Sequence, residues 1–433
     1  MVVTLKRCAR ETEDWLRYHP KVRDLLSLCQ SWGDWLRTAR DPQEVARSIV
    51  RRCAAARWAR AAAAIHALQQ NIHERLAELD QRRLDWTEFA PEIKDGRIPK
   101  AAILKPYLGS SEKGVVFISF ENQWVKLLRH GDLHDFAARY DLVLAPSGSP
   151  HNLTNYVFAA AYPGTLFTLI SNGSDVAALP GVSDKFVVVP LFASSWVNPA
   201  RFTPKPKSER VFDLIMVANF AKFKRHHVLF RALRLMPRAF RILLIGQNQD
   251  TRNAASVEEE ARWYGVHERF TLRVNQTYAE VTQALCDSRA SVILSRREGS
   301  CVVVAESMFA DAPVAVLENA ELGSRAFINE QTGMFVREAE LATQLTELIQ
   351  HADRFAPRQW AEANISCWKS SERLNAILKE HALASGQTWT RDIAPMQWCP
   401  DPQPVRVEDR AWLAPERDVI AERFGVTIGP EPE

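Results

Sequence analysis

The chain has 433 residues, of which 46% are hydrophobic and 25% are charged, and its formal net charge at pH 7 is +3. This length exceeds that of one ordinary hydrophobic core and, with a composition typical of soluble globular proteins, predicts two domains plus extensions. The near-neutral charge gives no reason to expect a nucleic-acid partner, and we expect none.

The cysteines and the first residues indicate the cellular compartment. Seven cysteines are scattered without a CxxC pair, which indicates reduced thiols in a cytosolic protein. No signal peptide is recognisable at the amino terminus, and no apolar stretch is long enough to span a bilayer. We therefore expect a cytoplasmic protein. Residues 1–60 carry thirteen Lys or Arg against seven Asp or Glu, so peripheral contact with the inner membrane face stays open beside a solvated helical face.

Residues 1–98 are expected to form a helical amino-terminal extension. Asp41 and Pro42, with Glu44 three residues after the Asp, are a helix start signal. The run from there to about Leu84 contains neither Gly nor Pro, which predicts one long helix or a helical hairpin.

Residues 99–203 are predicted to form an amino-terminal Rossmann-like domain. A helix is expected at 122–139. Its alternation with strands predicts a mainly parallel sheet with helices on both faces. The strands are expected at 101–108, 114–120, 141–145, 165–170 and 186–190.

Residues 204–370 repeat this architecture as a carboxyl-terminal Rossmann-like domain, after a proline-punctuated linker at 199–206. The fold class is therefore α/β, with two Rossmann-like domains facing a cleft that the carboxyl ends of their strands line. Residues 371–433 are a carboxyl-terminal helix and a Trp- and Pro-rich tail, expected to wrap over a domain surface. Strands are expected at 211–218, 240–246, 270–274, 290–295 and 313–317, and helices at 227–236, 257–264, 278–287 and 301–310.

The stretch from Ser295 to Met308 carries two carboxylates at different points of a strand–loop–helix segment. Glu298 lies in the loop that leaves the strand, and Glu306 in the first two turns of the helix that follows. In this geometry the two can face one cleft at different depths. Free amides at the start of the helix form its positive end, where a phosphate can bind. The amides concerned are those of Gly299, Ser300, Cys301 and Val302.

This stretch resembles the donor-site signature of the family 4 (group 1) retaining glycosyltransferases, which have the GT-B fold. The likeness rests on the Glu-x7-Glu spacing, the helix after it, Pro313-Val314 and Thr332-Gly333, and covers about residues 185–345. It implies that Glu298 holds hydroxyls of the donor sugar and Glu306 those of the ribose, with the amides on the distal phosphate. The alternative is that both glutamates are ordinary solvated residues. The strand, the glycine turn, the helix and Pro-Val all follow one another at the spacing of the family, and this favours the functional interpretation.

Upstream, the family places an Arg and, five residues later, a Lys on the donor pyrophosphate. Lys224 occupies the Lys position, but Asn219 occupies the Arg position, and Lys222 or Arg225 could restore the missing charge. Cations are needed because the leaving nucleotide diphosphate gains negative charge as the sugar bond breaks. The resemblance implies that side chains and a helix dipole do this without a metal or other cofactor. The alternative for Lys222 and Lys224 is a solvated basic loop.

The amino-terminal domain offers weaker signals. Many family members carry a His after the strand that corresponds to 114–120, and here Glu121 follows it. Glu121 either faces the sugar as a polar group, or the role is absent and Asn122 caps a helix. His130 and His134 are interpreted as a surface pair rather than a metal site.

The resemblance therefore implies a retaining, metal-independent glycosyltransferase of the hexosyltransferase type, with the donor bound by residues 204–370 and the acceptor by residues 99–203. Its partners would be a nucleotide-diphosphate sugar and the hydroxyl of a glycan or other acceptor, as in bacterial polysaccharide synthesis. Missing GxGxxG and GxxxxGK[ST] motifs argue against a dinucleotide oxidoreductase and a P-loop NTPase. Two alternatives stay open: a GT-B nucleotide-sugar epimerase, and a catalytically silent relative that binds a glycan or a protein.

Overall fold

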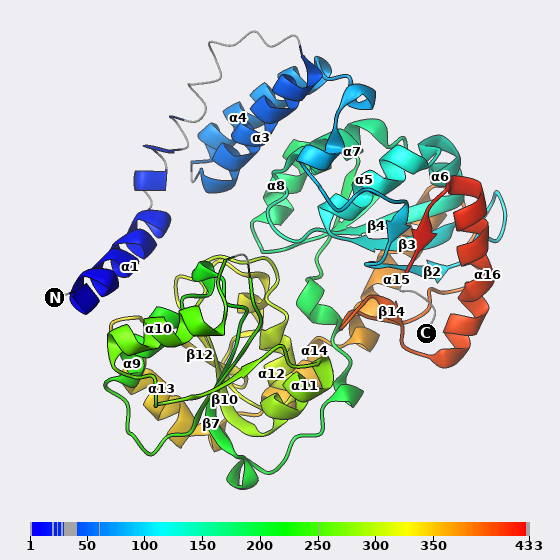
Figure 1. Ribbon diagram of the computed structural model, residues 1–433. Coiled ribbons are helices and arrows are strands. Elements are labelled where there is room, and N and C mark those ends of the chain that lie inside the picture. The colour runs from blue at the N-terminus through cyan, green and yellow to red at the C-terminus, as the bar shows by residue number, and fades with distance from the viewer. Residues whose placement is uncertain are drawn as a thin grey trace. The chain divides into compact units, whose positions relative to one another are not determined.

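The computed structural model describes residues 2–19, 21–23, 25–26, 29, 41–59, 61–249 and 251–429 (Figure 1). The chain forms two compact units. Unit 1 comprises Met1–Asp14 and Ser194–Lys369, and unit 2 comprises Trp15–Ala193 and Ser370–Glu433. These units differ from the predicted segments at three points. The main segment of unit 1 begins at Ser194, ten residues before the predicted start at 204, and unit 1 also includes the first residues of the helical extension. The tail belongs to unit 2.

Unit 1 is built on a six-stranded parallel sheet in the order β12-β11-β10-β7-β8-β9. The strands β8 and β11 are apolar and buried along their whole length, as expected when helices cover both sides of a sheet. The chain order reverses between β7 and β10, which are neighbours in the sheet. The strands are β7 (Phe212–Val217), β8 (Ile242–Gly246), β9 (Thr271–Val274), β10 (Ser288–Ile293), β11 (Val314–Leu317) and β12 (Gly333–Val336).

Helices lie on both faces of this sheet in Figure 1. On one face are α9 (His226–Leu233), α10 (Ala254–Tyr264) and α13 (Leu341–Gln350). On the other face are α11 (Tyr278–Cys286), α12 (Val303–Phe309) and α14 (Pro357–Asn364).

Unit 2 contains a five-stranded sheet in the order β2-β3-β4-β5-β6. The edge strand β2 runs antiparallel to β3, and the remaining pairs are parallel. The predicted fold class, α/β with two Rossmann-like sheets and a helical extension, is confirmed. The strands are β2 (Ala101–Lys105), β3 (Gly114–Ser119), β4 (Tyr140–Ala145), β5 (Leu166–Leu169) and β6 (Phe186–Val189).

The single helix predicted at 122–139 is wrong, because the structure has two helices there, α5 (Glu121–His130) and α6 (Leu133–Arg139). Gly131 ends α5. The carboxylate of Asp132 then caps α6 by accepting hydrogen bonds from the amides of His134 and Asp135. Helices α7 (Leu153–Ala161) and α8 (Asp175–Val182) complete the crossovers of this unit.

Most of the extension and the tail belong to unit 2. Helices α3 (Pro42–Trp58) and α4 (Ala62–Ala77) form the predicted hairpin and contact α7. In the tail, α16 (Val407–Phe424) packs on β2, and β15 (Thr427–Ile428) pairs with β1 (Arg97–Ile98). The expected wrapping of the tail is thus confirmed. The remaining elements are α15 (Cys367–Ala384), β13 (Met396–Gln397) and β14 (Gln403–Pro404).

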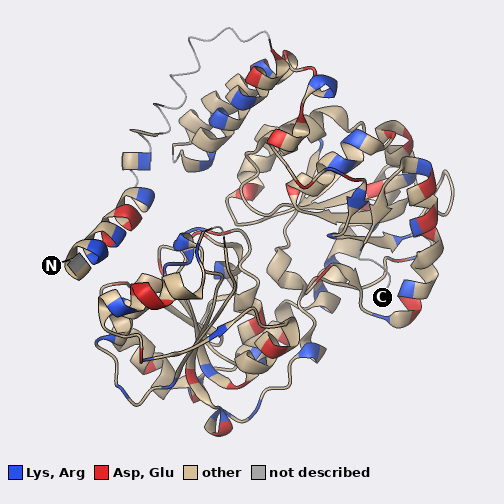
Figure 2. Ribbon diagram, in the orientation of Figure 1, with Lys and Arg blue, Asp and Glu red and all other residues tan. Residues whose placement is uncertain are grey.

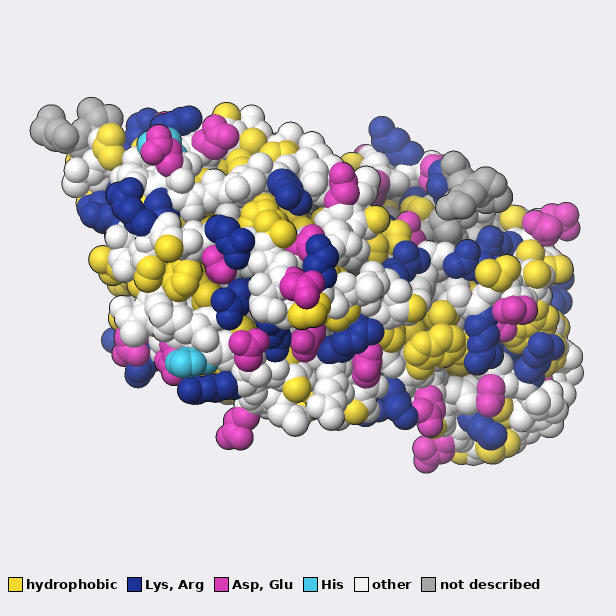
Figure 3. All heavy atoms as spheres, turned by 90° about the horizontal axis from the view of Figure 1, so that it is seen from below, with side chains coloured by type: hydrophobic (Ala, Val, Ile, Leu, Met, Phe, Trp, Pro, Cys, Tyr) yellow, Lys and Arg dark blue, Asp and Glu magenta, His cyan; other side chains and the backbone are white. Residues whose placement is uncertain are grey.

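Two observations concern membrane contact, which the sequence leaves open, and nucleic acid, which is not expected as a partner. No described helix combines the length and the hydropathy that crossing a bilayer requires. Figure 3 shows basic and acidic side chains intermixed over the face that it presents, so neither sign of charge dominates the described part of that face.

Candidate functional site

The site lies where β7 and β10 end in unit 1. Numbered within their own sheet, the six strands have the order 3-2-1-4-5-6, with the reversal between β7 and β10. In sheets of this kind, ligands bind outside the carboxyl ends of the strands at the reversal, because the two following loops diverge there. The loop after β7 carries Lys224, and the loop after β10 carries Glu298.

Lys224 and Glu298 meet across these two loops. The ammonium nitrogen of Lys224 lies 2.6 Å from Oε2 of Glu298, and both side chains are largely buried. Burial acts to lower the pKa of Lys224, but the charge of Glu298 outweighs it, and the pKa is raised. Lys224 is therefore a buried cation fixed at the strand reversal.

One carboxylate oxygen of this ion pair is available as a hydrogen-bond acceptor. Oε1 of Glu298 is buried and accepts no hydrogen bond from the described residues. A cavity of about 10 Å³ lies beside the pair and is lined by Lys224, Glu298 and Cys301 among others. It has room for about one water molecule. Oε1 can therefore accept a hydrogen bond from an incoming hydroxyl group.

The second predicted carboxylate, Glu306, lies in the first turn of α12 and is 7% exposed. The helix begins at Val303, two residues later than predicted, because Cys301 adopts a left-handed conformation with φ 54°. The amides of Gly299–Val302 thus belong to a turn ahead of the helix. Ser300 has its own partner, since its hydroxyl donates to Oγ of Ser194 at 2.7 Å.

Asn219 stabilises its own loop. Its side-chain oxygen accepts a hydrogen bond from the amide of Ala221, and its amide group donates to Gln249 at 3.4 Å. This is the usual turn-forming behaviour of Asn.

The two candidates for the missing cation are engaged elsewhere. Lys222 is held by Glu13 at 2.9 Å. Arg225 is buried between Asp14, at 2.7 Å, and Glu338, at 2.9 Å. The expectation that one of them replaces the family arginine therefore finds no support.

Sequence reasoning missed the contribution of helix α1 (Val2–Tyr18) to this loop. Arg10 donates to the buried Glu260 at 2.9 Å and to the carbonyl oxygen of Lys222 at 2.8 Å. Asp14 accepts from both the Nε and the Nη2 of Arg225. Figure 2 marks the charged residues along this helix. The signal in the sequence is the spacing of Arg10 and Asp14, which places both on one helix face.

Helix α9 begins with two buried histidines directly after this loop. Burial and the neighbouring charges of Arg252 and Lys224 lower the pKa of His226 to about 3, and the pKa of His227 is also lowered, chiefly by burial. Both are therefore neutral at physiological pH and do not act as cations for phosphate.

In unit 2, Glu121 ties a loop to the start of α5. Its carboxylate accepts hydrogen bonds from the amide and the hydroxyl of Ser147, at 3.0 and 2.7 Å, and from the side chain of Asn152 at 3.2 Å. The alternative of a cap by Asn122 is wrong, because Phe120 holds the capping position with φ 66° and Asn122 donates to Glu92. A contact between Glu121 and a sugar stays a prediction.

The predicted surface histidine pair is exposed, as expected, at His130 and His134. Within the described ranges, no group of three or more His, Cys, Asp and Glu side chains is placed to hold a metal ion.

Residues 211–351 match the sequence profile of a family described as glycosyl transferases group 1. The predicted resemblance is thereby confirmed for this part of the chain. The matched range contains Lys224, Glu298 and Glu306. Among curated protein sequences, none matches the chain.

Several solved structures are similar in fold to this chain. Sucrose-phosphate synthase from Thermosynechococcus elongatus has a TM-score of 0.49 at 15% identity, with 62% of this chain and 74% of that chain covered. Anabaena HepE in complex with UDP and glucose has a TM-score of 0.49 at 14% identity, with 61% and 78% covered. The pneumococcal O-GlcNAc transferase GtfA in complex with UDP and GlcNAc has a TM-score of 0.44 at 14% identity, with 61% and 55% covered.

Proposed function

We propose that this chain is a retaining glycosyltransferase that moves a sugar from a nucleotide-diphosphate donor to the hydroxyl of a glycan or other acceptor. The observation that carries the proposal is the buried pair of Lys224 and Glu298 at the strand reversal of unit 1, inside the residues that match the group 1 profile. Cytoplasmic synthesis of a bacterial polysaccharide is the setting we propose.

The two partners of the pair would take different parts of the donor. Lys224 stays charged although it is buried, so it would bind the pyrophosphate and stabilise the negative charge that grows on it as the sugar leaves. Glu298 would accept a hydrogen bond from a sugar hydroxyl through Oε1. Donor binding would thus replace an internal ion pair by two contacts with the substrate.

Glu306 would fix the nucleoside end of the donor. It is buried in the first turn of α12, the helix that follows the loop of Glu298. A carboxylate can accept hydrogen bonds from two ribose hydroxyls. The turn amides of residues 299–302 would face the distal phosphate. We propose that the reaction uses these protein groups with no metal and no further cofactor.

A second candidate is a catalytically silent relative that binds the nucleotide sugar or a glycan without transferring it. The specific observation in its favour is Asn219, which stands where the family has an arginine. Lys222 and Arg225 do not replace that charge, because Glu13 and Asp14 hold them. Lys224 would then be the principal cation on the pyrophosphate.

Thermal unfolding with UDP, GDP, ADP and their common sugars tests donor binding. A ligand at about 100 times its Kd should stabilise the folded chain by about 2.7 kcal/mol. We expect one nucleotide to raise the Tm of the wild type and of Glu330→Ala, an exposed control in unit 1, but not of Glu306→Ala. No shift with any of them would contradict the donor site.

Release of the nucleotide then separates the two candidates. The transferase releases nucleoside diphosphate faster when an acceptor is added, whereas a silent relative binds the donor and releases none.

A further inference from the structure

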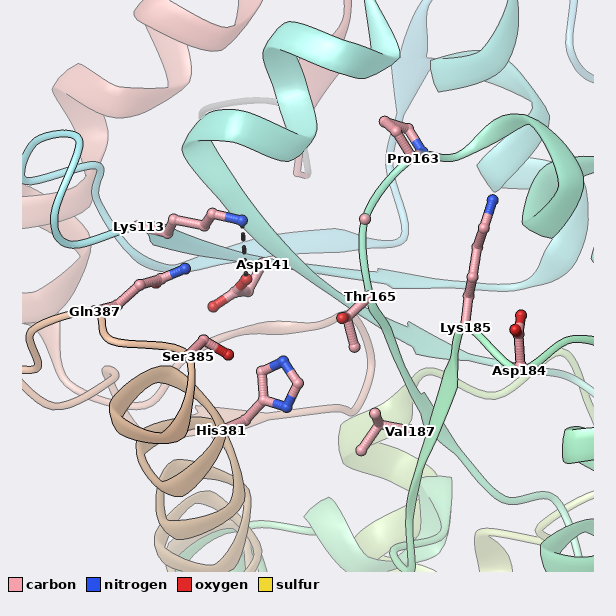
Figure 4. A pocket seen from close by; sticks show the side chains of 11 residues that line it. Lys113, Asp141, Pro163, Thr165, Asp184, Lys185, Val187, His381, Ser385 and Gln387 are labelled. Atoms are coloured by element: carbon pink, nitrogen blue, oxygen red, sulfur yellow. Dashed lines mark ion pairs between the residues drawn. The ribbon is translucent and has the colours of Figure 1, made fainter.

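A cavity of about 490 Å³ opens in unit 2, away from the carboxyl ends of its strands (Figure 4). Asp141 is the second residue of β4, Thr165 directly precedes β5, and Lys113 directly precedes β3. All three therefore lie at the amino ends of parallel strands. The loops that carry Glu121 and Ser147 leave the opposite edge of the same sheet. The cavity is thus a separate feature from any site at those loops.

Among the polar residues that line the cavity, Asp141 is the one that is buried, with its side chain 9% exposed. The ammonium group of Lys113 lies 3.8 Å from it, which is longer than a hydrogen bond. Apart from this contact, no described residue donates a hydrogen bond to Asp141. Burial raises the pKa of Asp141, against the opposing charges of Lys113 and Lys105. A buried carboxylate with so few donors is unfavourable, so a ligand that supplies donors would stabilise it.

Four further polar side chains end around this carboxylate, and Figure 4 shows them gathered there: Gln387, Ser385, His381 and Thr165. None of their side chains forms a hydrogen bond with another residue in the described part of the chain. The ring of His381 packs edge-on against Phe167, with ring centroids 5.0 Å apart, which fixes its position. Hydrogen-bond donors and acceptors therefore surround this cavity without forming hydrogen bonds with one another.

The charges at the base of this space select the class of ligand. The charges of Lys113 and Asp141 offset each other. The carboxylate would repel a phosphate, and the ammonium group would repel a charged amine. Lys185, at the rim, donates to the carbonyl oxygens of Ala159 and Tyr162. Hydroxyl groups both donate and accept hydrogen bonds, and so match this mixed lining.

We propose that this cavity binds an uncharged polyhydroxylated molecule of the sugar class, in a site that contains no residue of unit 1. Its volume lies within the range of about 300–1,000 Å³ that small-molecule sites occupy. Ring hydroxyls would donate to Asp141 and accept from Lys113 and Gln387. The proposal does not depend on transferase activity.

Calorimetric titration of the full chain with D-glucose, D-galactose and N-acetyl-D-glucosamine tests the site, with inorganic phosphate and 1,4-diaminobutane as charged probes. We expect saturable binding of at least one sugar and tighter binding of it than of either charged probe. Asp141→Asn should weaken the binding about tenfold or more, because it removes a charged hydrogen-bond acceptor.

Two further variants keep the test decisive if Asp141→Asn unfolds. Gln387→Ala alters a half-exposed side chain and should weaken binding severalfold, whereas Gln70→Ala, exposed on α4, should not. Glu298→Gln should leave this binding unchanged, because Glu298 is the residue proposed to hold the donor sugar, and this separates the cavity from the proposed donor site. The proposal is overturned if no sugar binds, if a charged probe binds more tightly, or if Gln387→Ala behaves like Gln70→Ala.

Discussion

A carboxylate oxygen of Asp14 lies 2.7 Å from the guanidinium of Arg225, although 211 residues separate the two in sequence. Arg225 directly follows Lys224, is 1% exposed and has a left-handed backbone with φ 60°. Such a conformation is strained in residues other than glycine by about 1–3 kcal/mol. The ion pair therefore connects the amino-terminal helix to a strained loop that carries the buried cation.

Replacing Asp14 should destabilise unit 1. Asp14→Asn removes one of the two carboxylates around a buried guanidinium, and because Glu338 remains we expect a loss of about 1–3 kcal/mol in the free energy of unfolding. Urea denaturation measures this loss. Glu13→Gln on the same helix breaks the exposed pair with Lys222 and should cost less than about 1 kcal/mol. Equal effects of the two variants would show that Asp14 does not anchor the loop.

Two lysines of one loop should differ in their effect on the donor. Lys224→Met removes the buried cation at the strand reversal, and we expect nucleotide affinity to fall about tenfold or more. Lys222→Met is the matched control, because Lys222 is 44% exposed and paired with Glu13. Titration of both variants with the nucleotide that stabilises the wild type compares them. A larger loss in Lys222→Met would overturn the assignment of the pyrophosphate to Lys224.

A methyl group at Gly333 should disrupt the edge of the unit 1 sheet. A Cβ atom there would lie 2.0 Å from the carbonyl oxygen of Val314 on the neighbouring strand β11. Gly333→Ala must therefore displace β12, and we expect a loss of about 1–3 kcal/mol in the free energy of unfolding. Gly173→Ala is the control, since nothing lies within 4 Å of its added Cβ. Urea denaturation of both variants checks the difference.

Acid should weaken unit 2 through Glu112. Burial acts to raise the pKa of this carboxyl, but the ion pair with Lys105 at 2.9 Å and hydrogen bonds from Thr390 outweigh it and lower the pKa to about 2. The folded-state pKa lies below the unfolded value of 4.5, so the stabilisation is present above pH 4.5 and is lost as the pH falls toward about 2.

Urea denaturation between pH 6 and pH 2 should therefore show a loss of stability that is shallower in Glu112→Gln. A slope unchanged by this substitution would contradict the assignment.

Five of the six strands of unit 1 could be predicted to within a few residues, because continuous apolar runs such as Ile242–Gly246 are typical of buried parallel strands. The edge strand β12 was not predicted. The resemblance assigned Lys224 and Glu298 to one donor site, but the ion pair between them was not predicted. The orientation of Arg225 could not be predicted, because it depends on Asp14, and no local pattern connects residues so far apart. Gly131 marked the break between α5 and α6, but a Gly within a helical pattern does not by itself end a helix.

The division of the chain into its two units has a consequence for the order of folding during synthesis. The sheet of unit 1 is contained in residues 194–369, whereas unit 2 needs both the segment before this range and Ser370–Glu433 after it. Because domains fold as their residues leave the ribosome, the sheet of unit 1 can form while unit 2 still lacks α16 and β15. Until those last residues emerge, the edge strand β2 has no cover from α16, and it is exposed to pairing with other chains.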